Sequence, residues 1–290
     1  MLAVDASLIT RCACEFHYDP CVFTIEKAMR PDFLPVPART AKPRSVGLTH
    51  VLDKGAAPDD VRKLVDRASD LIDIWKLGWG TAYLEPDVGE KVAILQRAGV
   101  QACVGGTLLE AAWAAGAAER CLAWAAEVGF SCVEVSNGAV EMPLREKRRL
   151  VSEASGGFVV IAEVGSKSPT AEVSAKAWAE EMLGDLEAGA TWALAEGRET
   201  GTVGLYHEDG RIRTEVAELV ADAVGLSRVV FEAPRKEQQA WLIQRFGANV
   251  SLGNVALNEV FAVEALRLGL RADTVATARR RVPNDASAST

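Results

Sequence analysis

The chain has 290 residues, 49% of which are hydrophobic, and it carries a formal net charge of −8. This composition supports a sizeable core, while the acidic balance argues against nonspecific binding to nucleic acid or to a membrane surface. No apolar run approaches the roughly 20 residues that span a bilayer, and residues 1–30 lack the apolar core of a secretory signal, so we expect a cytoplasmic protein.

The first 43 residues predict an irregular leader. Prolines recur from residue 31 to residue 43, where they exclude a regular helix. Three cysteines and a histidine crowd the same segment, but their spacing matches no common zinc pattern: Cys12, Cys14, His17 and Cys21. We therefore expect no metal site in the leader.

From residue 44 to residue 275, apolar runs alternate with helical patterns. The apolar runs predict strands at 46–52, 71–77, 100–104, 132–135, 158–164, 191–195, 228–233 and 250–255. Apolar residues at helical spacing predict helices at 58–70, 86–98, 108–128, 141–155, 170–189, 213–224, 235–246 and 256–268. Several predicted helices end at a glycine, which readily adopts the conformation that stops a helix: Gly99, Gly129, Gly189 and Gly247.

This alternation predicts an α/β protein with a single (β/α)8 TIM barrel domain at residues 44–275. Strands that are apolar on both faces, such as 158–164, belong to a parallel sheet that helices cover on both sides. An open doubly wound sheet is the alternative, but the glycine-rich dinucleotide fingerprint after its first strand is missing. Residues 276–290 are expected to form a disordered tail.

Charged residues and glycines collect where the predicted strands end. The carboxyl ends of parallel strands carry the chemistry of such folds. Because Lys and Glu are rarely buried without partners, charges embedded in apolar strands are either paired in structural salt bridges or functional. For each single residue both interpretations remain open, whereas the whole set favours a site: Asp53, Lys54, Lys76, Trp79, Gly106, Thr107, Glu134, Ser136, Glu163, Lys167, Glu196, Arg198, Glu232, Arg235 and Asn254.

The types of charge indicate a chemistry. Several carboxylates suit Mg²⁺, which takes one or two of them together with water and substrate oxygens. Lysine and arginine beside glycine-rich turns suit a phosphate or a carboxylate. The turns at 105–107 and 252–254 let backbone N–H groups approach an anion. No histidine favours a nucleophilic triad, and His50, inside the first strand, is interpreted as structural.

Several segments are similar to those of a known family. They read GLTHVLDKG (47–55), KLGWGT (76–81), GGTLLE (105–110), EVSNG (134–138), AEVGSK (162–167), AEGRETG (195–201), FEAPRKEQQ (231–239) and LGNVALNEV (252–260). Over about residues 44–275 the chain resembles the phosphosulfolactate synthase family. The resemblance implies a (β/α)8 barrel and a lyase that adds sulfite to phosphoenolpyruvate with Mg²⁺, giving (2R)-phosphosulfolactate, the opening step of a coenzyme M route.

On this resemblance we assign roles as hypotheses. The catalytic candidates are Lys54, Lys76 and Lys167, with Lys167 the first choice as proton donor to C2 of the substrate. The candidate metal ligands are Asp53, Glu134, Glu163 and Glu196. The substrate-binding candidates are Trp79, Gly106, Thr107, Ser136, Arg198, Arg235 and Asn254. In this scheme Arg198 and Lys54 hold the phosphate, and Lys76 collects sulfite or the substrate carboxylate.

Two other functions stay open at this point. One is a different Mg²⁺-dependent lyase or aldolase that acts on a phosphorylated enolate without sulfite. The other is a non-catalytic barrel that serves as a binding protein. Apolar helix faces, such as the one at 111–118, also allow a homo-oligomer.

Overall fold

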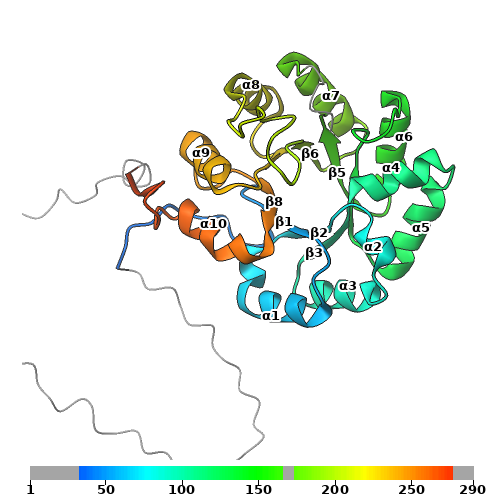
Figure 1. Ribbon diagram of the computed structural model, residues 1–290, viewed down its shortest axis with the longest axis horizontal. Helices are drawn as coiled ribbons and strands as arrows, with labels where there is room; N and C mark the ends of the chain where they lie inside the picture. The colour runs from blue at the N-terminus through cyan, green and yellow to red at the C-terminus, as the bar shows by residue number, and fades with distance from the viewer. Residues whose placement is uncertain (1–32, 166–172, 277–290) are drawn as a thin grey trace, which may run out of the picture. The chain divides into compact units, whose positions relative to one another are not determined.

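The chain forms a closed barrel of parallel strands in sequential order, with helices around it (Figure 1). The computed structural model describes residues 33–165 and 173–276. The strands are β1 (Thr49–Asp53), β2 (Ile74–Leu77), β3 (Gln101–Val104), β4 (Cys132–Val135), β5 (Val159–Val164), β6 (Trp192–Ala195), β7 (Val229–Glu232) and β8 (Leu252–Ala256). Because β8 pairs back onto β1, the predicted (β/α)8 barrel is confirmed.

The helices follow the predicted pattern with two differences. They are α1 (Pro58–Ala68), α2 (Thr81–Leu84), α3 (Val88–Arg97), α4 (Gly106–Ala114), α5 (Ala118–Val128), α6 (Leu144–Ser155), α7 (Ala175–Glu187), α8 (Thr214–Val224), α9 (Lys236–Phe246) and α10 (Val260–Arg267), with 3₁₀ turns η2 (Ser69–Leu71) and η3 (Leu257–Glu259). The single helix predicted at 108–128 is wrong, because the chain breaks at Gly116, whose φ of 65° no regular helix contains. The short α2 was not predicted.

Four predicted helix ends are confirmed. The glycines that follow α3, α5, α7 and α9 all have positive φ: Gly99, Gly129, Gly189 and Gly247. At Gly129 the φ of 99° lets its N–H donate to the Ala125 carbonyl at 3.1 Å, which ends α5 with a satisfied backbone.

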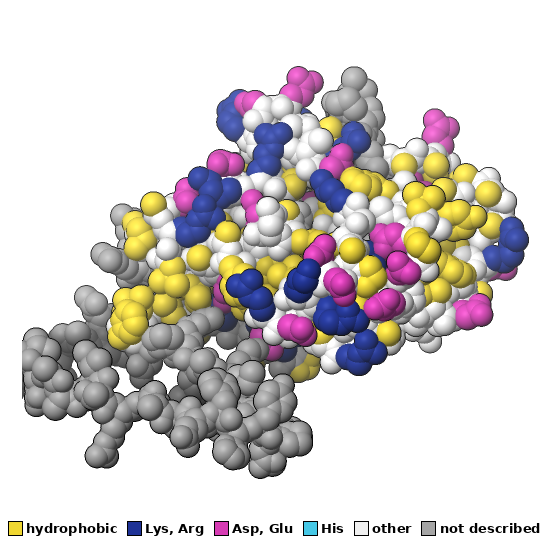
Figure 2. All heavy atoms as spheres, turned by 60° about the horizontal axis from the view of Figure 1, so that its bottom comes forward, with side chains coloured by type: hydrophobic (Ala, Val, Ile, Leu, Met, Phe, Trp, Pro, Cys, Tyr) yellow, Lys and Arg dark blue, Asp and Glu magenta, His cyan; other side chains and the backbone are white. Residues whose placement is uncertain are grey.

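The outer surface of the barrel carries interleaved charges. Figure 2 shows lysine and arginine side chains alternating with aspartate and glutamate over one face. On α1, for example, the Arg62 guanidinium lies 3.1 Å from Asp59 on the same helix and 3.1 Å from Glu90 on α3. Exposed pairs of this kind add about 0–1 kcal/mol each and mainly keep the surface soluble and mixed in sign.

Residues ahead of the first strand pack against the barrel. Its compact unit starts at Val36, and residues before Gly47 bond to the amino-terminal end of the strands. The Lys42 ammonium donates to the Ile72 carbonyl at 2.6 Å, and the Arg44 guanidinium donates to Asp73 at 3.0 Å. Residues 36–43 contain no helix or strand, and they close the amino-terminal end of the barrel.

Parts of the predicted leader and tail fall beyond the structure. Residues 1–32, with the cysteine-rich segment, and residues 277–290 lie outside the described residues. Within the described part of the chain, no helix combines the length and apolar character needed to cross a membrane.

Candidate active site at the barrel mouth

A polar layer lies inside the barrel on top of an apolar floor. The floor consists of inward-pointing side chains: Leu48, Ile74, Cys103, Cys132, Ile161, Leu194 and Val230. Because side chains two residues apart on a strand share a face, the residues two positions later also point inward. These residues are buried and almost all polar: His50, Lys76, Gly105, Glu134, Glu163, Glu196 and Glu232.

Lys76 is the central cation of this layer. Its ammonium lies 2.9 Å from Glu134 and 3.2 Å from Glu232. Burial by itself lowers the pKa of Lys76, but the carboxylates of Glu134, Glu232 and Glu163 outweigh burial and raise that pKa above its ordinary value. Lys76 is therefore charged at neutral pH.

Glu134 is held in place from three sides. Its Oε2 accepts the Gly106 N–H at 3.2 Å, and its Oε1 lies 3.3 Å from Nε2 of His50 in addition to the Lys76 contact. Burial alone would raise the pKa of the Glu134 carboxyl, but Lys76 and then His50 lower it to about 2. His50 thus belongs to the polar layer, and its Nδ1 accepts the Asn254 N–H at 3.4 Å.

The segment after β6 turns sharply across the mouth. The Arg198 N–H donates to Oε1 of Glu196 at 2.6 Å, and the Gly197 N–H donates to Oε2 of Glu232 at 2.9 Å. A side chain at Gly197 would meet the Tyr206 ring at 2.5 Å, so only glycine fits there. Two carboxylates of the polar layer therefore fix the backbone that presents Arg198.

Three residues at the barrel mouth have a strained backbone conformation. Among the described residues, three non-glycine residues have positive φ: Trp79 at 52°, Arg198 at 56° and Asn254 at 53°. Trp79 and Arg198 follow a barrel strand and Asn254 lies within β8, and all three line one cavity. Such conformations cost of order 1–3 kcal/mol for most residues and cluster at functional sites. Asn254 also buries its Oδ1 with no hydrogen-bond partner, as a group reserved for a ligand would.

The cavity has a volume of about 260 Å³ and opens at the carboxyl ends of the strands. It is lined by Leu52, Lys76, Trp79, Gly105, Gly106, Thr107, Glu134, Ala139, Glu163, Glu196, Arg198, Glu199, Glu232 and Asn254. Most of these positions carry a role in the hypotheses drawn from the sequence. Glu232 and Glu199 carry none, although Glu232 follows the inward-pointing Val230 by two residues, so strand alternation alone places it on the inner face.

Several predicted site residues lie elsewhere. Asp53 points out of the barrel toward the helices, where its carboxylate lies 2.6 Å from Lys91 and accepts the Trp75 indole N–H at 2.9 Å. Its neighbour Lys54 is exposed, with its ammonium 5.7 Å from the centre of the Trp79 ring at the rim. Asp53 is therefore a structural residue, and we withdraw it from the candidate metal ligands.

Ser136 lies behind the cavity rather than in it. Its hydroxyl donates to Oε1 of the buried Glu110, whose Oε2 accepts the N–H groups of Ala139 and Val140 at 2.7 and 2.9 Å. A side chain at Gly106 would collide with the Ser136 hydroxyl, so Ser136 supports the glycine turn instead of contacting a substrate.

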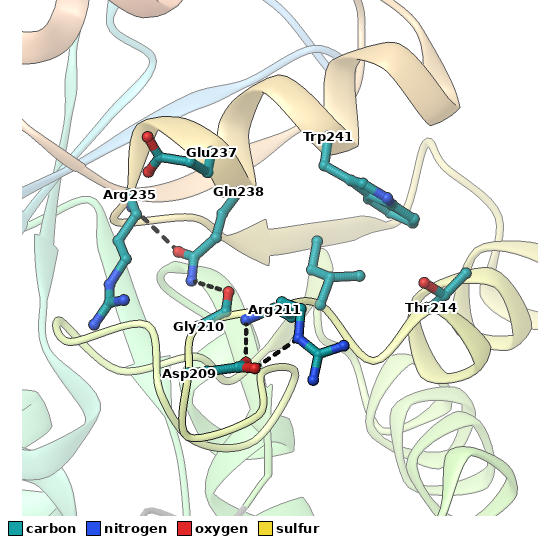
Figure 3. A pocket seen from close by; sticks show the side chains of 9 residues that line it. Asp209, Gly210, Arg211, Thr214, Arg235, Glu237, Gln238 and Trp241 are labelled. Atoms are coloured by element: carbon teal, nitrogen blue, oxygen red, sulfur yellow. Dashed lines mark hydrogen bonds and ion pairs between the residues drawn. The ribbon is translucent and has the colours of Figure 1, made fainter.

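Arg235 borders a different cavity, and Lys167 is not described. Figure 3 shows Arg235 beside the segment at 209–214 and the start of α9, in a cavity of about 610 Å³. Its Nε donates to the Thr200 carbonyl at 2.6 Å, so we remove it from the substrate-binding set. Lys167 lies outside the described residues, between 165 and 173.

The cavity combines an excess of negative charge with a few cations. Four buried carboxylates face one buried ammonium: Glu134, Glu163, Glu196 and Glu232 around Lys76. Within residues 33–165 and 173–276, no three His, Cys, Asp or Glu side chains converge closely enough to bind a metal ion by themselves. A divalent cation here would be held by one or two carboxylates together with water and substrate oxygens, which is the usual coordination of Mg²⁺.

Comparisons with known proteins agree with the motifs. The family model described as (2R)-phospho-3-sulfolactate synthase (ComA) matches residues 37–273. The chain is 40% identical over 250 residues to the phosphosulfolactate synthase of Methanothermobacter thermautotrophicus, covering 84% of this chain and 96% of the relative. It is 35% identical to that of Bacillus subtilis (83% and 97% covered) and 38% identical to that of Methanocaldococcus jannaschii (79% and 93% covered).

Solved structures are more distant. A thiamine phosphate pyrophosphorylase from Pyrococcus furiosus superposes with a TM-score of 0.49 at 14% identity, covering 77% of this chain and 94% of that chain. At that level of similarity the comparison carries no information about function. The family match, in contrast, spans every residue that lines the mouth cavity.

Proposed function

The chain belongs to the (2R)-phospho-3-sulfolactate synthase family, and on that basis we propose that it adds sulfite to phosphoenolpyruvate to give (2R)-phosphosulfolactate. The observation that carries the proposal is that the family match over residues 37–273 includes the entire mouth cavity, with its buried carboxylates and Lys76. In this reaction the enzyme is a carbon–sulfur lyase acting in the direction of addition, and its substrates are small anions.

The reaction sets three requirements. The sulfur of sulfite forms a bond to C3 of phosphoenolpyruvate, the electron pair of the double bond moves toward C2 and the carboxylate, and a proton is then added to C2. No group leaves. The site must therefore bring two anions together, stabilise the extra charge on the carboxylate, and deliver a proton to one face of C2.

The carboxylates of the mouth fit a magnesium ion. We assign the ion to Glu163 and Glu196, which line the cavity from neighbouring strands, because Glu134 and Glu232 hold Lys76. Bound Mg²⁺ would supply a Lewis acid that stabilises negative charge on the substrate carboxylate. The net negative charge of the layer supports a cation at this place, since anionic substrates alone would be repelled.

Cations and backbone donors of the mouth would bind the substrate. Arg198 reaches the cavity from a strained turn, and its planar guanidinium suits a phosphate. Gly106 and Thr107 begin α4, so the Thr107 N–H and the helix dipole also favour an anion, while the Gly106 N–H is donated to Glu134. Lys76 would attract sulfite or the substrate carboxylate.

A different residue is proposed as the proton donor. The raised pKa of Lys76 makes its ammonium a weak acid, which argues for an electrostatic role instead of proton transfer to carbon. We therefore keep Lys167 as the proposed acid. A Lys167→Ala variant that retained full turnover would remove it from that role.

A ³¹P NMR experiment tests the proposed function. Purified protein is mixed with phosphoenolpyruvate, sulfite and Mg²⁺, and we expect a new phosphate ester that requires sulfite and disappears when EDTA removes the metal. Matched samples omit sulfite or protein. If phosphoenolpyruvate is bound but unchanged, the nucleophile is a different one; if neither phosphoenolpyruvate nor Mg²⁺ binds, the catalytic proposal fails.

A further inference from the structure

Two consecutive glutamines at the start of α9 are buried, and the proposed reaction gives them no role. Gln238 is 2% exposed and Gln239 is 1% exposed, although glutamine is usually found at the surface. They end the FEAPRKEQQ segment, which begins at Phe231 in β7 and runs into α9. A buried amide must satisfy its hydrogen bonds, so the partners of these two side chains show what the pair does.

Gln238 binds the segment between β6 and α8. Its Nε2 donates to the Gly201 carbonyl at 2.9 Å and to the Gly210 carbonyl at 3.1 Å, while its Oε1 accepts the Arg235 N–H at 3.2 Å. Figure 3 shows the amide between α9 and the turn at Gly210. A side chain at Gly201 would lie 2.5 Å from Nε2, so the glycine lets the backbone approach the amide closely.

Gln239 points to the other side of the helix. Its Nε2 donates to the Ala233 carbonyl at 3.0 Å, in the turn after β7, and to the Glu259 carboxylate at 3.0 Å, in η3 after β8. The two adjacent side chains therefore bind three successive segments at the carboxyl end of the barrel: those that follow β6, β7 and β8.

Each of these segments adjoins residues of the mouth. The segment after β6 carries Arg198 and Glu199, the turn after β7 follows Glu232, and η3 continues directly from the strand that contains Asn254. Two of those residues, Arg198 and Asn254, have the positive φ values noted above. A strained backbone persists only where its surroundings fix it.

We propose that Gln238 and Gln239 are positioning residues, which hold the segments after β6, β7 and β8 in the arrangement that shapes the mouth. An amide suits this task because each side chain offers two N–H donors and a carbonyl acceptor. At Gln238 both N–H donors and the carbonyl acceptor have partners: two backbone carbonyls accept from the nitrogen, and one backbone N–H donates to the oxygen. Neither side chain lines the mouth cavity of about 260 Å³, so both act on it through the backbone that they bind.

The test separates the two glutamines. Gln238→Met and Gln239→Met preserve the approximate size of the side chain and remove the donors, and Gln244→Met, an exposed position on the same helix, is the matched control. In hydrogen–deuterium exchange, we expect Gln238→Met to raise exchange in residues 197–213 by about tenfold, the effect of losing one or two net hydrogen bonds. We expect Gln239→Met to raise exchange in residues 254–259 instead, and Gln244→Met to change neither segment.

Kinetics provide the second measurement, and this part rests on the proposed function. Both positioning variants should raise KM for phosphoenolpyruvate about tenfold. The lost hydrogen bonds lower the midpoint of unfolding by denaturant whether the role is positioning or merely structural, whereas a merely structural role would leave KM unchanged, so KM decides between the two. Gln238→Glu is the second variant, in case Gln238→Met does not fold. It preserves size but places a carboxylate oxygen against the Gly201 and Gly210 carbonyls, so its exchange should rise at least as much.

The outcomes distinguish the two proposals. Unchanged exchange in 197–213 for both folded Gln238 variants, or the same change in Gln244→Met, would overturn the positioning role. Absence of a sulfite-dependent product in the wild-type protein would overturn the proposed function and leave the exchange results interpretable, because they require no substrate.

Discussion

The two ends of the barrel bury the same kinds of charge in opposite ways. At the amino-terminal end, the guanidinium of Arg267 donates to the Val250 carbonyl at 2.6 Å and to the Leu48 carbonyl at 3.0 Å. Arg39 lies beside it and pairs with Glu264 at 3.2 Å. At the carboxyl-terminal end, Lys76 faces carboxylates that border a cavity of about 260 Å³.

The pKa values reflect this difference. Burial lowers the pKa of Arg267 to about 9, and the neighbouring Arg39 contributes to the decrease. Lys76 is equally buried, yet its pKa is raised, because the carboxylates outweigh desolvation. A cation bound mainly by carbonyls closes one end of the barrel, whereas an excess of carboxylates around a cavity at the other end calls for further cations or a ligand. Burial of charge alone therefore does not mark a site; an imbalance of charge beside a cavity does.

The sharpest test of this comparison removes one cation from each end. Lys76→Met should lower kcat/KM for the sulfite reaction by about 10³-fold, or about 4 kcal/mol, because it removes an anion-binding charge from the cavity. It should also destabilise the fold by about 3–5 kcal/mol, since Glu134 and Glu232 are left buried without their ammonium. Arg39→Met should lower stability and leave kcat/KM unchanged when it is assayed well below its unfolding temperature.

Denaturant unfolding and steady-state kinetics measure both variants. If Arg39→Met lowered kcat/KM as strongly as Lys76→Met, the two ends would be coupled and the distinction between a structural end and a functional end would be lost.

Acid should weaken the mouth selectively. The folded-state pKa of Glu134 is lowered from 4.5 to about 2, so its contribution to stability is present above pH 4.5 and lost as the pH falls toward 2. A shift of that size corresponds to about 3 kcal/mol of stability. For Lys76 the pKa is raised, so its contribution persists up to its ordinary value of 10.5 and is lost only as the pH rises through the folded value.

Comparing the wild type with Glu134→Gln isolates this effect from all other acid titrations. The free energy of unfolding of each protein is measured between pH 7 and pH 2. The difference between the two values should be constant down to about pH 4.5 and decrease below it. Parallel curves across the whole range would show that Glu134 titrates at its ordinary pKa.

Substitutions at Arg198, one of the strained residues, should change stability and activity independently. Arg198→Ala and Arg198→Gly both remove the guanidinium and should lower kcat/KM about 100-fold, the effect of losing a charge-assisted contact to phosphate. Glycine adopts the φ of 56° without strain, so Arg198→Gly should be more stable than Arg198→Ala by about 1 kcal/mol. Equal stabilities would mean that the turn relaxes, and that no strain is stored at the mouth.

Much of the site could be predicted because it follows from strand periodicity. Lys76, Glu134, Glu163 and Glu196 lie in or beside apolar strands at their carboxyl ends, so an alternating pattern and a parallel barrel place them together. The same alternation places adjacent residues of a strand on opposite faces of the sheet. Asp53 follows the inward-pointing Leu52 by one residue and therefore faces the helices, where Lys91 binds it.

The remaining features depend on contacts between segments that are distant in sequence. The anchoring of residues 36–44 requires carbonyls of the segments that precede β2 and β8, such as those of Ile72 and Ala248, which no local pattern reveals. The break between α4 and α5 was missed because the alanine-rich sequence on both sides of Gly116 has strong helix propensity. Arg235 was misplaced because it comes after the turn at Ala233 and Pro234, which carries the chain out of the barrel toward α9.

The smallest expected effect concerns the rim. Lys54 is exposed, with its ammonium 5.7 Å from the centre of the Trp79 ring, so solvent screens its charge. Lys54→Met should raise KM for phosphoenolpyruvate only about two- to threefold at low salt, and the difference should vanish near 0.5 M salt, as expected for an exposed charge. Lys63→Met, which removes an exposed lysine from α1, is the matched control. A loss near 10³-fold for Lys54→Met, persisting in salt, would extend the essential charges beyond the buried layer, and would require Lys54 to enter the closed site when substrate binds.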